Sequence, residues 1–331
     1  MNNYFRNKKI LVTGGDGFIG SHLVEKLVKL KSKVTALCYY NSFNYAGWLE
    51  NYNKSNLANP KIVFGDVRDF KQMNEFAKRQ DIIFHLASLI GIPYSYKSPK
   101  AYIDTNLIGT YNILEAARLN SINKIYVTST SEVYGNASTN KIDETHELKA
   151  QSPYSASKIA ADKLAESYYL SYNLPVTVIR PFNTYGPRQS MRAVIPTIIS
   201  QILSKNKKIQ LGNVNTLRDF NYIDDTINGF LSIAQKKSQG QVINICSGQN
   251  ISIVEIVNLI KKILNSKIKI SFDKKRFRPT KSEVDNLIGN NEKIYKFTDW
   301  KSKTSLEVGL RKTINWFKKN QAFKGRNNYN I

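Results

Sequence analysis

The sequence predicts an α/β protein that begins with a doubly wound parallel sheet and ends in a smaller C-terminal α/β lobe. Two observations predict this fold class. Short apolar segments alternate with amphipathic ones through the first half of the chain, and a glycine-rich turn follows the first apolar segment. Alternating strands and helices are typical of parallel sheets with right-handed crossovers.

Six near-continuous apolar runs are the expected strands, because a strand of a parallel sheet is covered on both faces. They are Lys9–Thr13, Lys33–Leu37, Lys61–Phe64, Ile82–Leu86, Lys124–Thr128 and Val176–Ile179. Amphipathic stretches between them predict helices over Ser21–Leu30, Thr105–Asn120 and Ser155–Tyr172. We expect residues 1–180 to form the first domain.

The pattern changes after Arg180, where Pro181, Gly186 and Pro187 interrupt the chain. Helices then dominate, and the expected ones are Ala193–Ser204, Asp224–Lys236, Ser252–Leu264 and Ser305–Asn320. Two short strands, Gln241–Ile245 and Lys267–Phe272, are expected between them. We expect residues 181–331 to form the smaller lobe, with some chain crossing between the two parts and a frayed tail at Lys324–Ile331.

Composition narrows the function classes. Of the 331 residues, 41% are apolar, which predicts a packed globule. No run approaches the roughly 20 apolar residues that span a bilayer, and the N-terminus has no signal-peptide core. We therefore expect a cytoplasmic protein with no membrane contact. Cys38 and Cys246 lie in apolar stretches, and with three histidines they show no metal-ligand spacing.

The formal net charge of +24 is unusually high. Its basic residues are scattered and form no long block with interleaved aromatics, which favours a general surface bias over a nucleic-acid site. A cationic surface would still attract a substrate that bears a diphosphate.

A glycine-rich loop, TGGDGFIG, runs from Thr13 to Gly20. It follows an expected strand and opens an expected helix, which predicts a Rossmann dinucleotide site. Gly14 permits a tight turn, Gly17 lets a pyrophosphate approach the backbone, and Gly20 lets the helix pack on the sheet. The segment Ala36–Asn44 has neither an acid for the ribose of NAD nor an Arg for the 2′-phosphate of NADP, so both cofactors stay open.

Tyr154 and Lys158 lie about one helical turn apart in YSASK and share a helix face. An ammonium near a phenol favours the phenolate and lowers the phenol pKa. Tyr154 is therefore the expected base, which takes a proton from a hydroxyl while hydride passes to a nicotinamide.

The fifth expected strand ends in TSTSEVYG, Thr128 to Gly135. Chemistry in open α/β sheets lies at the carboxyl ends of strands. Thr130 can hydrogen-bond the hydroxyl that Tyr154 deprotonates, and Glu132 can act as a base at an adjacent carbon once a ketone has acidified its proton. The alternative for Glu132 is a solvated loop carboxylate.

These motifs resemble the extended short-chain dehydrogenase/reductase family, which contains nucleotide-sugar epimerases and dehydratases. The resemblance extends to about Phe317. The matching segments, in order, are TGGDGFIG, GDVRD at Gly65–Asp69, HLAS at His85–Ser88, TNLIGT at Thr105–Thr110, TSTSEVYG, YSASK, RPFNTYGPR at Arg180–Arg188 and RDFNYIDD at Arg218–Asp225.

The resemblance implies further site residues. Those expected to line the cofactor, besides the three glycines, Tyr154 and Lys158, are Phe18, Ile19, Asp66, Val67, Leu86, Ala87, Ser88 and Pro181, with Asp66 and Val67 at the adenine and Pro181 at the nicotinamide. Those expected to hold the substrate's diphosphate are Asn183, Arg218 and Arg278. Arg suits this role because its planar fork matches phosphate oxygens.

Within the family, Thr130, Ser131 and Glu132 are similar to the catalytic run of GDP-mannose 4,6-dehydratases, and UDP-glucuronate decarboxylases show a similar run. The segments Tyr40–Glu50 and Arg192–Ile202 resemble N-acetylglucosamine-nucleotide 4,6-dehydratases of legionaminic acid biosynthesis, a cell-surface glycan pathway. That resemblance implies a GDP- or UDP-linked N-acetylglucosamine as substrate. UDP-glucuronate decarboxylation, 4-epimerisation and a non-catalytic NAD(P)- or RNA-binding module are the alternatives.

The implied reaction recycles a tightly bound NAD or NADP. Tyr154, helped by Thr130 and Lys158, deprotonates the 4-hydroxyl; Glu132 takes the carbon-5 proton, and water leaves carbon 6 with Ser131 as the candidate assistant. The resemblance also implies a homodimer, in which the helices Thr105–Asn120 and Ser155–Tyr172 pair with their copies.

Overall fold

The computed structural model describes residues 3–50, 60–204 and 206–320, and it confirms the α/β class. Seven parallel strands form one sheet in the order β11-β6-β5-β4-β1-β2-β3. Their bounds are β1 Lys9–Thr13, β2 Lys33–Tyr39, β3 Lys61–Gly65, β4 Ile82–His85, β5 Lys124–Thr128, β6 Val176–Pro181 and β11 Val242–Ile245. The first six agree with the predicted strands to within two residues at each end.

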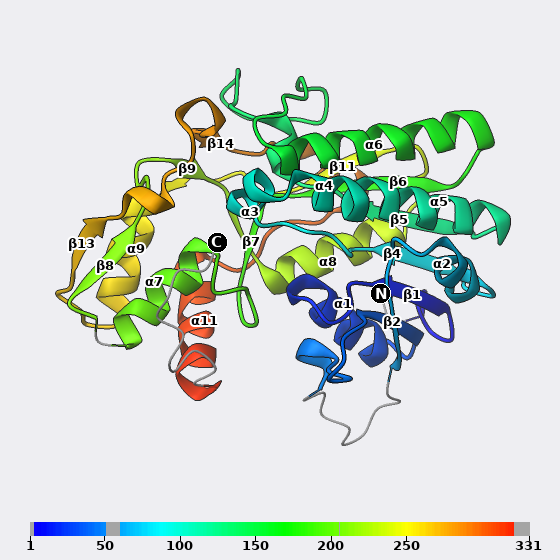
Figure 1. Ribbon diagram of the computed structural model, residues 1–331, viewed down its shortest axis with the longest axis horizontal. Coiled ribbons are helices and arrows are strands. Elements are labelled where there is room, and N and C mark those ends of the chain that lie inside the picture. The colour runs from blue at the N-terminus through cyan, green and yellow to red at the C-terminus, as the bar shows by residue number, and fades with distance from the viewer. Residues whose placement is uncertain (1–2, 51–59, 205, 321–331) are drawn as a thin grey trace.

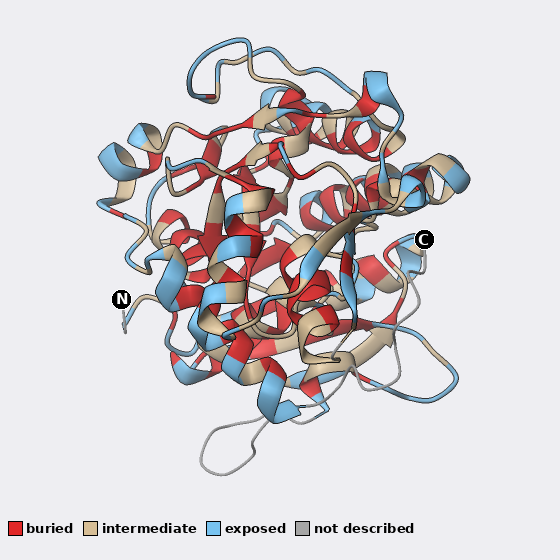
Figure 2. Ribbon diagram, turned by 90° about the vertical axis from the view of Figure 1, so that its left-hand side faces the viewer, coloured by how far each residue is buried: buried red, intermediate tan, exposed pale blue. Residues whose placement is uncertain are grey.

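Helices cover both faces of this sheet (Figure 1). On one face lie α1 (Phe18–Lys29) and α8 (Ile223–Ala234); on the other lie α2 (Phe70–Ala77), α5 (Gly109–Leu119) and α6 (Pro153–Tyr172). Alternate strand residues face the two layers: in β1, Ile10 packs on the α1 side and Leu11 on the α5 side. Buried residues therefore gather along the sheet and the inner helix surfaces (Figure 2).

The position of β11 corrects one expectation. We expected Gln241–Ile245 in the C-terminal lobe, but Val242–Ile245 pairs in parallel with β6 and forms an edge of the main sheet. Helix α8, also beyond residue 180, packs on α1. Neither placement follows from local periodicity, because both depend on contacts with segments far away in the sequence.

The remaining C-terminal elements lie beside the main sheet, at the left of Figure 1. The helices there are α7 (Val194–Leu203), α9 (Ile253–Ile263) and α11 (Leu306–Asn320), and β8 (Lys208–Leu211) pairs in parallel with β13 (Lys269–Phe272). Helix α10 (Glu292–Thr298) packs on α8 and β11. Between the lobe and the sheet lie the short strands β7 (Asn183–Tyr185), β9 (Leu217–Arg218), β10 (Phe220–Tyr222), β12 (Ile251–Ser252) and β14 (Asn286–Leu287). The tail Lys324–Ile331 is outside the described residues.

The helix expected over Thr105–Asn120 is part of a longer run that changes type. It consists of α4 (Pro99–Tyr102), the π-helical segment η2 (Ile103–Ile108) and α5. The other short helices are α3 (Ile92–Lys97) and the 3₁₀ turns η1 (Gly47–Leu49), η3 (Ser131–Tyr134), η4 (Lys274–Arg276) and η5 (Thr280–Ser282). Within the part of the chain that the structure describes, no helix is both long and apolar enough to cross a bilayer.

Candidate active site

The glycine-rich loop between β1 and α1 brings three backbone segments close together. Gly14 has a left-handed backbone with φ 67°, and a Cβ at this position would lie 2.9 Å from the backbone nitrogen of Ala87. A Cβ on Gly20 would overlap the carbonyl oxygen of Gly14. Only residues without a side chain fit this turn, so its compactness depends on the glycines.

Helix α1 follows this loop directly, and within the part of the chain that the structure describes no hydrogen bond engages the backbone N–H groups of Phe18 and Ile19. Gly17 is the N-cap and provides no side-chain cap, and the helix starts at Phe18. The first N–H groups of a helix, here those of Phe18 and Ile19, have no partner within the helix and attract anions. Together with the exposed backbone of Gly17, they fit the pyrophosphate of a dinucleotide.

The segment after β4 packs against the start of the glycine-rich loop. The Oγ1 of Thr13 accepts hydrogen bonds from the backbone N–H groups of Leu86 and Ala87, each at 3.1 Å. The Ser88 hydroxyl donates to Oδ1 of Asn106 at 2.9 Å. Asn106 lies in the π-helical segment η2 and is fully buried. It was not foreseen from the sequence, because a π-helical turn has no clear periodicity.

Asp66 and Val67 lie at the carboxyl end of β3, next to β2. The carboxylate of Asp66 binds Nε of Arg68 at 2.9 Å, and this contact lowers the pKa of Asp66. Val67 is buried, and its carbonyl accepts a hydrogen bond from Asn112 at 2.9 Å. Both residues are thus held in fixed positions at the edge where the adenine was expected.

The structure brings Thr130, Glu132 and Tyr154 together. Thr130 is the N-cap of η3, and its Oγ1 accepts the N–H of Glu132 at 3.3 Å. The side chain of Thr130 also lies near the phenol of Tyr154 and acts to lower the pKa of that phenol. Ser131, the first residue of η3, is buried.

Burial raises the pKa of Tyr154; the nearby charge of Glu132 also raises it, and the hydrogen bond with Thr130 opposes this change. This corrects the expectation that the phenol is made acidic by its helical neighbour. The Nζ of Lys158 donates to the carbonyl of Thr128 at 2.6 Å, at the end of β5. Burial also lowers the pKa of Lys158 to about 8, and the negative charge of Asp162 opposes that shift.

Beneath Lys158 lies a buried ion pair that sequence analysis did not identify. Asp162 follows Lys158 by one helical turn, and its Oδ2 accepts from Nε of Arg180 at 2.9 Å and from the hydroxyl of Ser129 at 2.8 Å. Arg180 also donates to the hydroxyl of Tyr134 at 2.9 Å. The pair fixes α6 against β6, the strand that leads to Pro181.

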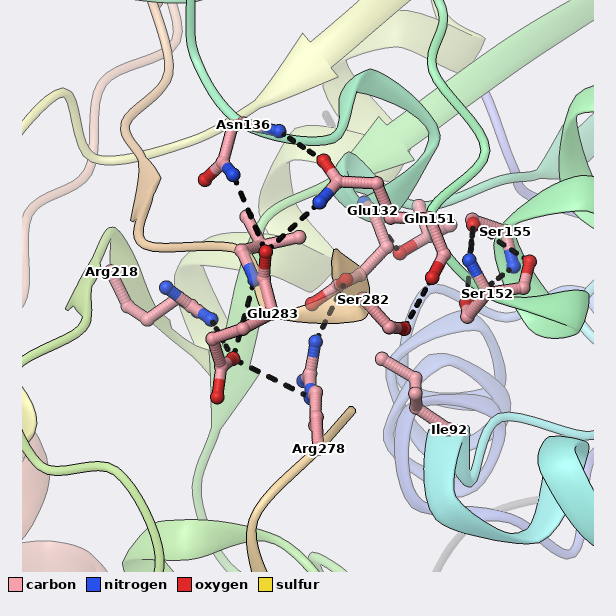
Figure 3. A network of polar contacts seen from close by, with 12 residues as sticks. Ile92, Glu132, Asn136, Gln151, Ser152, Ser155, Arg218, Arg278, Ser282 and Glu283 are labelled. Carbon is pink, nitrogen blue, oxygen red and sulfur yellow. Dashed lines mark hydrogen bonds and ion pairs between the residues drawn. The ribbon is translucent and has the colours of Figure 1, made fainter. Parts of the chain in front are cut away.

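Arg218 and Arg278 lie close to the carboxylates of Glu132 and Glu283 (Figure 3). Arg278 Nη1 lies 3.4 Å from Glu132 Oε2, and Arg278 Nε lies 3.8 Å from Glu283 Oε1. Arg218 Nη2 approaches the same Glu283 oxygen at 3.9 Å. The expected diphosphate residues Arg218 and Arg278 are therefore neighbours of the candidate base. Glu283 was not predicted, because nothing in its local sequence marks the contact.

Asn183 and Pro181 lie where β6 continues into β7. Pro181 is the last residue of β6 and pairs with Ile245. Asn183 donates to the carbonyl of Asp219, from N at 3.1 Å and from Nδ2 at 3.4 Å. Since Asp219 directly follows Arg218, this contact places Asn183 beside the arginine without joining the ion-pair network.

The chain is similar in sequence to known proteins over nearly its whole length. A family model described as GDP-mannose 4,6-dehydratase matches residues 11–313. The chain is 31% identical over 322 residues to a dTDP-D-glucose 4,6-dehydratase of Homo sapiens, covering 95% of this chain and 91% of that protein. It is 32% identical over 322 residues to a UDP-N-acetyl-alpha-D-glucosaminuronate decarboxylase of Bacillus cytotoxicus, covering 94% and 98%.

Solved structures give the same answer for the fold. A UDP-N-acetylglucosamine 4-epimerase from Methanobrevibacter ruminantium, in complex with UDP-N-acetylmuramic acid, has a TM-score of 0.85 at 30% identity, covering 95% of this chain and 99% of that chain. A dTDP-glucose 4,6-dehydratase from Streptomyces venezuelae, solved with NAD bound, has a TM-score of 0.86 at 26% identity, covering 97% and 100%. The similar proteins thus include dehydratases, an epimerase and a decarboxylase.

Proposed function

Because the chain belongs to the GDP-mannose 4,6-dehydratase family of extended short-chain dehydrogenases/reductases, which are NAD-dependent enzymes of nucleotide sugars, we propose that it is a nucleotide-sugar 4,6-dehydratase. Its substrate is a GDP- or UDP-linked N-acetylglucosamine, and its product is the 4-keto-6-deoxy sugar nucleotide used in legionaminic acid biosynthesis. The observation that supports this choice is the Glu132 carboxylate beside Thr130 and Tyr154.

The glycine-rich loop suits a dinucleotide whose phosphates would lie at Gly17 and the first turn of α1, because no described residue occupies the N–H groups of that turn. When bound, NAD supplies a hydride acceptor at sugar carbon 4 and returns that hydride to carbon 6. A cofactor recycled within each turnover need not leave the cleft. We therefore expect it to remain bound through purification.

Tyr154 is the base for the 4-hydroxyl. Because burial raises its pKa, the phenolate that accepts the proton of the 4-hydroxyl must be stabilised by its neighbours. The hydroxyl of Thr130, which lies next to the phenol, would hydrogen-bond the substrate hydroxyl and orient it toward the phenolate oxygen. Lys158 supplies positive charge one helical turn below, in a buried position where charge acts strongly.

Glu132 acts after the ketone has formed. The ketone acidifies the proton on carbon 5, and a carboxylate held by η3 beside Thr130 is in position to take it. Ser131 is the hydroxyl that we assign to assist the departing water. This second base distinguishes a dehydratase from an enzyme that only oxidises and reduces carbon 4.

Arg218 and Arg278 bind the diphosphate of the substrate. Both guanidiniums lie beside Glu132 and are largely buried, with side-chain exposures of 7% and 22%. Buried Arg forks bind phosphate strongly and with fixed geometry. Asn183, held by Asp219, extends this surface. The substrate would thus be anchored next to the base that acts on its sugar.

We also propose a homodimer formed through α5 and α6. Several large apolar side chains on these elements and on η2 are exposed, namely Ile103, Ile108, Tyr111, Leu119, Leu170 and Tyr172. Apolar side chains that gather on one exposed face mark protein–protein contacts. Light scattering coupled to gel filtration tests the proposal: a dimer mass supports it, and a monomer mass at micromolar concentration contradicts it.

The activity is tested by mass spectrometry of the products from a panel of nucleotide sugars, without added reductant. The proposal predicts loss of one water from GDP- or UDP-N-acetylglucosamine. Release of carbon dioxide from UDP-glucuronate would show a decarboxylase instead, and a new isomer of unchanged mass would show an epimerase. No turnover, with salt-sensitive binding of RNA, would show a non-catalytic module.

A further inference from the structure

The strand that should carry the ribose-binding acid ends without one. In doubly wound dinucleotide-binding proteins an Asp or Glu after the second strand binds the adenosine ribose. Here β2 ends in Cys38 and Tyr39. The Cys38 thiol is fully buried, and burial, followed by the negative charges of Asp16 and Glu50, raises its pKa to about 12. It is therefore a neutral core group and does not replace the acid.

The glycine-rich loop supplies a carboxylate at the same place. Asp16 lies between Gly15 and Gly17, and its Oδ2 accepts the backbone N–H of Tyr39 at 3.3 Å. The backbone carbonyl of Asp16 accepts the N–H of Trp48 at 3.2 Å. Asp16 is thus held at the carboxyl end of β2 from two sides. Apart from the N–H groups of Tyr39 and of Asp16 itself, no donor among the described residues hydrogen-bonds this carboxylate, so Oδ1 is available to accept a hydrogen bond from a ligand.

Among the described residues, a basic group that reaches this end of β2 is Arg68, and it is already paired with a carboxylate. Arg68 Nη2 lies 3.5 Å from the hydroxyl of Tyr39, but its Nε and Nη2 both bind the carboxylate of Asp66, at 2.9 and 2.5 Å. A 2′-phosphate at this position would face the Asp16 carboxylate, while the guanidinium that could balance it is engaged elsewhere. The charge arrangement therefore favours a ribose with free hydroxyl groups.

We propose that Asp16 selects the cofactor: its carboxylate accepts a hydrogen bond from the adenosine ribose of NAD and repels the 2′-phosphate of NADP. This inference rests on the proposed cofactor site but not on the proposed reaction. Asp16 has a second role on this geometry, since it also holds the end of β2. A test must separate these two roles.

Asp16→Asn separates them, because an amide keeps an acceptor oxygen for the N–H of Tyr39 but loses the charge. Glu50→Gln is the matched control. It removes the same charge from a neighbouring carboxylate, whose Oε1 accepts the N–H of Ala46 at 2.6 Å, and whose charge also acts on Cys38. Thermal unfolding of both variants shows whether the loop is preserved.

Two binding measurements test the inference on the full-length protein. The dinucleotide released by acid from the purified protein is identified by mass spectrometry, and calorimetry gives Kd for NAD and NADP after the bound dinucleotide has been removed. Wild type should contain NAD and bind it at least 10-fold more tightly than NADP. Asp16→Asn should reduce this preference by about 10- to 100-fold, the size expected for losing a hydrogen bond to an ionised group; Glu50→Gln should leave it unchanged.

An equal affinity of wild type for both cofactors would overturn the inference. An unchanged preference in Asp16→Asn would also overturn it. So would an equal change in Glu50→Gln, because that result would show that negative charge near the loop sets the preference without a direct contact. If wild type binds neither dinucleotide, the proposed function fails as well.

Discussion

Replacing Asp162 by Asn should destabilise the protein strongly, although no role in binding the substrate or the cofactor is assigned to this residue. The Arg180 side chain is 2% exposed and that of Asp162 is 0% exposed, with Nε and Oδ2 2.9 Å apart. The substitution leaves the Arg180 charge buried without its counter-ion, which costs about 3–5 kcal/mol. At about 2 cal/mol/K of unfolding entropy per residue, this lowers the Tm by about 4–7 °C for a chain of 331 residues.

The assay is thermal unfolding at neutral pH, followed by circular dichroism. The control is the double variant Asp162→Leu with Arg180→Met, which removes both charges and should recover most of the loss, since apolar replacement of a whole buried pair is often neutral. A Tm for Asp162→Asn within 1 °C of wild type would refute the claim that the pair is buried and charged. Equal losses in the single and double variants would also refute it.

Three further predictions concern the cleft. Gly14→Ala places a Cβ 2.9 Å from the Ala87 nitrogen on a left-handed backbone, so the purified protein should contain little bound dinucleotide. The dinucleotide content is measured by absorbance after acid release, and a normal content would contradict the role of this loop in dinucleotide binding. Arg278→Ala should raise KM for the nucleotide sugar about 10- to 100-fold, the size of one lost charge-assisted contact, and a KM within twofold of wild type in steady-state assays would contradict its role. The pKa of Lys158 is about 8 because of burial, so its ammonium form is lost as pH rises through that value and kcat should fall there. In the Lys158→Arg variant, any residual activity should persist to higher pH because a guanidinium stays charged. A flat profile for wild type between pH 7 and about 9 would show that the ammonium is not needed.

Local patterns were enough to predict most of the sheet. Each strand from β1 to β6 is an apolar run, largely buried except in the edge strand β3, and a run of this kind is visible in the sequence without knowledge of its neighbours. The strand Val242–Ile245 has the same pattern, yet its place beside β6 depends on a pairing between distant segments. Its existence could therefore be predicted, but its membership of the main sheet could not.

The candidate site could also be predicted only where it depends on local sequence patterns. The motifs that contain Thr130, Glu132, Tyr154 and Lys158 mark short-range arrangements. In the structure the first three side chains lie together, and the Lys158 ammonium binds the carbonyl of Thr128. The raised pKa of Tyr154 was missed because burial is a property of the whole fold, whereas the helical spacing to Lys158 is local. Glu283 was missed for a similar reason: it meets Arg218 only because strand β9 and the segment after η5 come together.

The central claim is that Glu132 removes a proton from carbon 5 of a sugar already oxidised at carbon 4. Its most direct test is the reaction of wild type and Glu132→Gln with GDP- and UDP-N-acetylglucosamine in deuterated water, followed by mass spectrometry and NMR of the products. The account predicts a wild-type product that has lost one water and gained one deuterium at carbon 5, and a Glu132→Gln variant that reduces its bound nicotinamide but releases no dehydrated product. A dehydrated product from Glu132→Gln at the wild-type rate, or a wild-type product of unchanged mass, would contradict it.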